Sequence, residues 1–140
     1  MRSFTMGTTV SMSYDETVAR VRELLAEAGF GVLTEIDLAN TLSAKLGVEM
    51  EPHLILGACR PQLAHRAVQA DVRISTMLPC NVVVAVDGDR TRVEVFDPAI
   101  MTEFSGDSAL AEVATDARSR LGGMLEALNN ETEKSDAVES

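Results

Sequence analysis

Apolar side chains recur along this chain at two different spacings, which predict a mixture of strands and helices. Residues 4–12 and 30–38 alternate between apolar or β-branched side chains and others, a pattern typical of strands with one buried face. Between them, Ser13 and Glu16 form a capping box that predicts the start of a helix. The helix is expected to end at Gly29, after apolar residues at helical spacing: Tyr14, Val18, Val21, Leu25 and Ala28.

The middle of the chain predicts a short helix, a strand and a second helix. Residues 38–46 have helical spacing and are followed by Gly47, a residue common just after a helix. Residues 53–59 form a largely apolar run that predicts a buried strand. Pro61 suits the first turn of a helix, because its missing N–H group has no partner there in any case. The apolar stripe of this helix consists of Leu63, Ala64, Ala67, Val68 and Ala70.

The last third predicts a β-hairpin and a long helix. Asp87 and Gly88 are a turn signal between the strand-like runs 81–86 and 91–96. Helical spacing then extends from Leu110 to Leu128, although two adjacent glycines inside it cost about 1 kcal/mol each. The order strand, helix, strand, short helix, strand, helix, hairpin, long helix predicts an α+β fold: a single antiparallel-rich sheet covered by helices.

The final twelve residues, 129–140, have a different composition. They contain almost no apolar side chain, and they hold four carboxylates against one lysine. Such a segment buries too little surface to offset the entropy lost on ordering. We therefore expect a single domain over residues 1–128 followed by a disordered acidic tail, whose deletion leaves the melting temperature unchanged.

Composition and charge limit the classes of partner. The chain has 140 residues, of which 46% are hydrophobic, and its formal net charge is −10. This charge repels phosphate backbones and anionic lipids, so we expect neither nucleic acid nor membrane as a partner. The sequence has no stretch typical of a signal peptide or of a membrane span, which favours a cytoplasmic protein. In that compartment its two cysteines are expected to be free thiols.

Cys59 is the first candidate for site chemistry. It ends a predicted strand just before the helix that Pro61 begins, and Arg60 is adjacent. A helix N-terminus and a nearby cation both lower the pKa of a thiol, so Cys59 is a candidate nucleophile or ligand. The alternative is that Cys59 is only a structural residue, because cysteine is among the most buried residue types and often serves as a small hydrophobic side chain.

Three further groups of residues could contribute to a site. His65 falls on the polar side of its helix and could act as a base or ligand, or simply be solvated. Cys80 lies at the start of a strand and could approach Cys59. Glu35 and Asp37 share one strand face, where two carboxylates can share a cation or a proton, or can be ordinary solvated side chains.

The sequence lacks the familiar signatures of metal centres, cofactors and enzymes. Zinc sites usually contain two close pairs of ligands, and this chain has none, which leaves Cys59, His65 and Cys80 as weak metal candidates. No phosphate-binding loop, catalytic triad order or G-x-S-x-G motif is present. We therefore predict no cofactor, and we favour a role without catalysis.

Four blocks of the sequence carry a resemblance to a known family. In chain order they are "GFGVLTEIDLANTLSAKLGVE", "ILGACRPQLAHRAVQAD", "LPCNVVV" and "VFDPAIM". Over about residues 14–101 the chain resembles domain of unknown function family 302. The resemblance implies a compact α+β domain of the TATA-binding-protein-like type that forms a homodimer, with no settled activity. It also implies that Cys59, His65, Cys80 and Asn81 match family positions.

Three functions are consistent with these observations. The leading hypothesis is a homodimeric small-molecule-binding module, with a cleft near Cys59 and His65 and candidate ligand-binding residues Glu35, Asp37, Cys59, His65, Cys80 and Asn81. The alternative is a thiol-based redox or metal-handling protein that uses Cys59, His65 and Cys80. An adaptor that acts only through protein contacts is a third, supported by nothing beyond the acidic tail.

Overall fold

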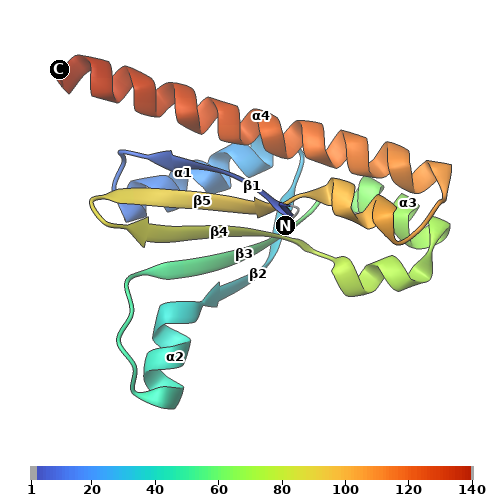
Figure 1. The fold of residues 1–140 in the computed structure, drawn as a ribbon, viewed down its shortest axis with the longest axis horizontal. Helices are drawn as coiled ribbons and strands as arrows, with labels where there is room; N and C mark the ends of the chain where they lie inside the picture. Colours follow the sequence, from blue (N-terminus) through green and yellow to red (C-terminus); the bar gives the residue numbers. More distant parts are fainter. Residues whose placement is uncertain (1–2, 140) are drawn as a thin grey trace.

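The computed structural model describes residues 3–139 and has the predicted order of elements, with two short 3₁₀ helices added (Figure 1). In chain order the elements are β1 (Thr5–Val10), α1 (Tyr14–Glu27), β2 (Gly31–Asp37), α2 (Leu38–Leu46), β3 (His53–Cys59), α3 (Pro61–Ala70), η1 (Val72–Met77), β4 (Cys80–Asp87), β5 (Arg90–Phe96), η2 (Pro98–Glu103) and α4 (Ser108–Glu139).

All five strands form one sheet in the order β1-β5-β4-β3-β2, and every neighbouring pair is antiparallel. This confirms the prediction of an α+β fold with a single antiparallel sheet. The local signals also act as expected. The Ser13 side chain accepts a hydrogen bond from the Glu16 amide at the start of α1, and Pro61 lies in the first turn of α3.

Helices cover one face of the sheet. On that face Leu56, Val82 and Val95 lie side by side on β3, β4 and β5, and all three are fully buried. They pack in one cluster with Leu25 of α1 and Leu121 of α4. Burying such side chains contributes about 1.5–3 kcal/mol each, so this cluster is the main source of stability.

The opposite face of the sheet is uncovered. In Figure 1, α1 lies behind the strands and no helix lies in front of them. Among the residues of this face in the described chain, only Gly57 is buried. We call this surface the open face and define it, from strand register and alternation, as Thr5, Gly7, Thr9, Thr34, Ile36, His53, Ile55, Gly57, Asn81, Val83, Ala85, Asp87, Arg90, Arg92, Glu94 and Phe96.

A second apolar cluster lies beyond one end of the sheet. It joins α3, η1, η2 and the first half of α4, and its buried residues include Leu63, Ile74, Met101 and Leu110. Because α4 contributes to both clusters, this one helix connects the two parts of the core.

The structure corrects the prediction for residues 30–38. Alternation there predicts a strand with one buried face, but no residue of β2 is buried, and Leu33 and Ile36 are exposed. β2 is an edge strand with a neighbour on one side only. Alternation identifies which side chains share a face, and it carries no information on whether another element covers that face.

The structure also differs from the predicted disordered tail. α4 continues through Asn129 to Glu139, and Thr132 is only 5% exposed. The Thr132 hydroxyl accepts a hydrogen bond from the Ser11 amide at 3.1 Å, and Glu131 forms an ion pair with Arg20 of α1 at 2.7 Å. The segment is polar, but Glu131, Thr132 and Asp136 have partners outside α4.

Candidate functional site

A small apolar cavity lies where the two apolar clusters meet, at the end of β3 and the start of α3. Its lining includes Phe30, Cys59, Leu63, Leu78, Cys80 and Met101. Several other lining residues are alanines of β3, α3 and α4, whose short side chains leave space at the junction. The volume open to water-sized molecules is about 20 Å³. That is enough for about one water molecule, or for a small group of a ligand.

Cys59 and Cys80 both line the cavity, an approach that the sequence left open. Cys80 lies opposite Ala58 in the β3–β4 ladder, so Cys59 is offset from it by one residue at the same end of the sheet. Both are free thiols; Cys80 is buried and Cys59 is half-buried.

Of the two alternatives for Cys59, the electrostatics of the site favour the buried thiol. Burial raises the pKa of the Cys59 thiol above its ordinary value. Burial, and secondarily the nearby Cys59, raises the pKa of Cys80 to about 11. Loss of hydration disfavours the charged thiolate, and here this effect exceeds any stabilisation by Arg60 or by the start of α3. Neither thiol has the low pKa typical of a nucleophile or redox centre.

Arg60 is the charged residue in the cavity lining, and its environment is unusual. Its Nε atom is buried and has no hydrogen-bond partner. Its guanidinium lies against Gly29, whose φ of 88° suits glycine and where a Cβ atom would collide with Arg60 Nη1. Beside it, Arg120 Nη1 donates a hydrogen bond to the Ala28 carbonyl at 2.9 Å. The two cations therefore lie at the C-terminal end of α1, where the helix dipole favours positive charge.

His65 does not join the cysteines. It lies on the exposed side of α3 and is not part of the cavity lining, in agreement with the polar position that periodicity gave it. Asn81 follows Cys80 directly, but it is exposed on the open face. Alternation along β4 places the two neighbours on opposite faces of the sheet.

Glu35 and Asp37 lie on β2, apart from the cavity, and each has a partner. Glu35 forms an ion pair with Arg22 of α1 at 2.7 Å. Asp37 caps α2 by accepting a hydrogen bond from the Asn40 amide at 2.9 Å. These contacts give both carboxylates a structural role in holding α1, β2 and α2.

A second hollow, which sequence reasoning missed, lies between the start of α1 and α2. It is wide and open, about 1070 Å³, and its lining includes Tyr14, Asp15, Asp37, Glu49 and Glu51. Burial, followed by the charges of Asp37, Asp15 and Glu35, raises the pKa of Tyr14. Within residues 3–139, no three His, Cys, Asp or Glu side chains are grouped so that they could hold a metal ion.

The cavity lining also includes residues that sequence reasoning did not select. Phe30 follows α1, Met101 belongs to η2, and Val113 and Ala117 come from α4. They are far apart in the sequence and carry no motif, so only the packing of α4 against α3 brings them to one place.

Comparison with known proteins agrees with this architecture. The family model for the domain of unknown function DUF302 matches residues 6–128. The chain belongs to the DUF302 family. A crystal structure of an uncharacterized conserved DUF302 protein from Bacillus stearothermophilus is 31% identical in sequence and has a TM-score of 0.83. That match covers 91% of this chain and 99% of the other, so the DUF302 fold accounts for almost the whole structure.

Two further findings bear on function. A search of curated proteins found no significant match to this chain. No helix among the described residues is long and apolar enough to cross a membrane. Membership of the DUF302 family therefore fixes the fold, and any function must be argued from the site itself.

Proposed function

We propose that this chain is a homodimeric small-molecule-binding module without catalytic chemistry, and that its ligand site is the cavity beside Cys59 and Arg60. The observation that supports this most is Arg60 Nε, a buried donor without an acceptor, on a residue that lines an otherwise apolar cavity. Buried polar groups without partners are rare in folded proteins, because each costs about 1–3 kcal/mol. An acceptor supplied by a ligand would remove this cost.

The lining limits the chemical class of the ligand. Aromatic and aliphatic side chains surround the cavity, so the buried part of the ligand is apolar. Arg60 adds a cation with several donors, which favours a carboxylate or another anionic group. We therefore infer a small amphiphilic anion. Because the free volume is only about 20 Å³, binding of more than a few atoms requires Leu78 or the flexible Met101 side chain to move.

Hexanoate and hexan-1-ol form a suitable pair of probes, since they share a chain length and differ in charge. We expect hexanoate to shift the methyl NMR signals of Ala58, Ala64 and Met101, which line the cavity. Arg60→Met should weaken hexanoate binding about tenfold or more and leave hexanol binding nearly unchanged, because only hexanoate makes charge-assisted hydrogen bonds.

Arg66→Met is the matched control. Arg66 lies on the exposed side of α3, where it pairs with Glu112 at 2.8 Å, and it does not line the cavity. This variant should bind both probes as the wild type does. If neither probe shifts the three methyl signals, or if both arginine variants weaken hexanoate equally, the proposed site is wrong.

The thiol-based alternative has less support. It is favoured by the proximity of Cys59 and Cys80, but burial raises the pKa of both. The free thiols fit the cytoplasmic setting that we propose. The homodimer is supported by the apolar side chains that the uncovered face of the sheet leaves accessible, namely Ile36, Ile55 and Val83.

A further inference from the structure

The open face combines an apolar half with a polar half. One row across the sheet runs from Ile36 to Ile55 to Val83 on β2, β3 and β4. Ile36 is 45% exposed, and the other two are half-buried although they lie inside the sheet. A monomer would leave this continuous apolar strip in water.

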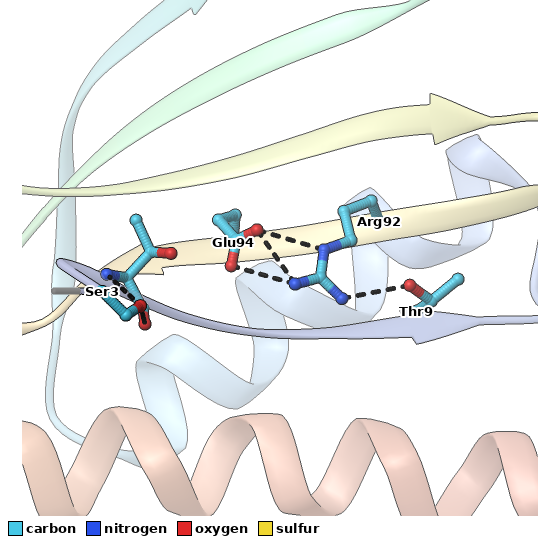
Figure 2. A network of polar contacts seen from close by, with 5 residues as sticks. Ser3, Thr9, Arg92 and Glu94 are labelled. Carbon is cyan, nitrogen blue, oxygen red and sulfur yellow. Dashed lines mark hydrogen bonds and ion pairs between the residues drawn. The ribbon is translucent and has the colours of Figure 1, made fainter. Parts of the chain in front are cut away.

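The polar half carries two charges that cancel. On β5, Arg92 donates hydrogen bonds to Glu94 at 3.0–3.1 Å, and it also donates to the Thr9 hydroxyl of β1 at 3.1 Å (Figure 2). Gly7 faces this pair and has no side chain, which leaves room for it; a Cβ atom there would collide with Glu94. Arg92 and Glu94 therefore neutralise each other within one copy of the chain.

We propose that the open face is the surface through which two copies of this chain associate. This inference rests on the proposed homodimer and names its interface. Each copy carries a net charge of −10, so two copies repel each other, and a contact surface without net charge of its own adds least to that repulsion. The open face meets that condition, since the charged side chains of β4 and β5 on it have opposite signs: Arg92 pairs with Glu94, and Asp87 lies opposite Arg90 at the rim.

The other exposed apolar surface fits a second copy less well. β2 is an edge strand and could pair with β2 of another copy. However, β2 carries Glu35 and Asp37, and antiparallel pairing would bring these carboxylates near their own counterparts. Like charges opposite one another destabilise a strand pair.

The open face is also large enough for a stable contact. Five strands spaced about 4.8 Å apart, each about seven residues long with a rise of about 3.3 Å, give a footprint of about 550 Å². Two copies would bury about 1,100 Å² in total, just above the roughly 1,000 Å² expected of a specific interface. Two sheets can pack face to face in this way, as in β-sandwiches.

Val83→Glu tests the proposal because β4 is the central strand, so Val83 lies near the middle of the face. In a two-fold dimer the change places two unpaired carboxylates in the interface. We expect sedimentation velocity of the full chain to show a dissociation constant raised about 100-fold or more. Val83→Thr, which keeps the β-branched shape, should raise it by a smaller factor, and circular dichroism should show both variants folded.

Val72→Glu is the matched control, because Val72 is 68% exposed on η1, outside the open face. This variant should leave the dimer intact. A wild-type chain that is monomeric at about 100 μM, well above ordinary dimer affinities, would overturn both the homodimer and this interface. A wild-type dimer that persists in Val83→Glu would overturn the interface alone. A dimer broken by Leu33→Glu on β2 and unaffected by Val83→Glu would assign the contact to the sheet edge instead.

Discussion

Single residues at the cavity show how burial can override a local electrostatic signal. Cys59 stands at the start of a helix and next to an arginine, the setting that lowers a thiol pKa in many reactive sites. Here the apolar lining removes water from the thiol, and its pKa rises. Desolvation depends on residues distant in sequence, such as Phe30 and Met101, so the sign of the shift could not be predicted from the motif.

The raised pKa values predict slow alkylation of both cysteines. Burial raises the pKa of Cys80 from an ordinary value of 9.0 to about 11, which lowers its thiolate fraction at neutral pH about 100-fold. We expect iodoacetamide near pH 7.5 to label Cys80 at least 100-fold more slowly than glutathione. Cys59, which is less buried, should react at a rate between these two. Mass spectrometry of the labelled peptides gives each rate.

Cys59→Ser isolates Cys80 and serves as the control for assigning the slow phase. In urea both cysteines should react as fast as glutathione does, because unfolding restores water to the two thiols. If Cys59 of the native protein reacts faster than glutathione, its thiolate is stabilised after all, and the thiol-based function regains its support.

At the scale of elements, the sequence predicts what is local. The Ser13 cap, Pro61 and the Asp87–Gly88 turn locate helices α1 and α3 and the β4–β5 hairpin within one or two residues. The two 3₁₀ helices also begin at capping aspartates, Asp71 and Asp97, the second followed by Pro98, but they were not predicted from the sequence. The coverage of a sheet face is decided by distant contacts, which is why β2 was predicted with a buried side that it lacks.

The end of α4 shows how composition can mislead. Leu121, Leu125 and Leu128 form its apolar stripe, and the next positions in helical register are Thr132 and Asp136. The stripe thus continues through polar residues that find hydrogen-bond and ion-pair partners, which hydropathy alone cannot reveal. The candidate ligand residues show the same limit, since only the two cysteines of that set line the cavity.

Truncation after Leu128 should therefore destabilise the protein. It removes the Thr132 acceptor of the Ser11 amide and the ion pairs that Arg20 and Arg90 make with α4. Losing one partly buried hydrogen bond costs about 1–3 kcal/mol, and losing the exposed ion pairs adds less than that. We expect the melting temperature to fall by about 3–10 °C in thermal unfolding followed by circular dichroism.

A single substitution refines this measurement. Thr132→Val removes the hydroxyl and keeps the shape, and it should cost about 1–2 kcal/mol of unfolding free energy. The control is Thr115→Val, because Thr115 is exposed on the same helix and bonds only to the Ala111 carbonyl. An unchanged melting temperature for residues 1–128 would support the disordered tail that the composition suggests.

At the scale of the whole molecule, the fold keeps the two proposed interaction surfaces apart. The cavity lies at the junction of the apolar clusters beyond the end of the sheet, and its lining comes mainly from the helices and from strand ends. The open face is made from the middle of the strands, on the side away from α1 and α4. A dimer formed through that face would leave α3 and the mouth of the cavity free to admit a ligand.

The net charge predicts how salt affects that dimer. Two chains with a net charge of −10 repel each other. The open face carries no net charge, so it adds no electrostatic attraction between the two copies. Raising the ionic strength from about 10 mM to about 100 mM shortens the Debye length from about 30 Å to about 10 Å and screens the repulsion. We expect the dissociation constant, measured by sedimentation velocity, to fall about threefold or more over this range.

The direction of this change separates two kinds of interface. A contact held together by ion pairs between copies weakens as salt is added, whereas an apolar contact opposed by net charge becomes stronger. Sodium chloride and sodium bromide at equal ionic strength should give the same shift, because screening depends on ion concentration and charge rather than on ion type. A dissociation constant that rises with either salt would mean that charged residues such as Arg92 and Glu94 pair across the interface instead of within one copy.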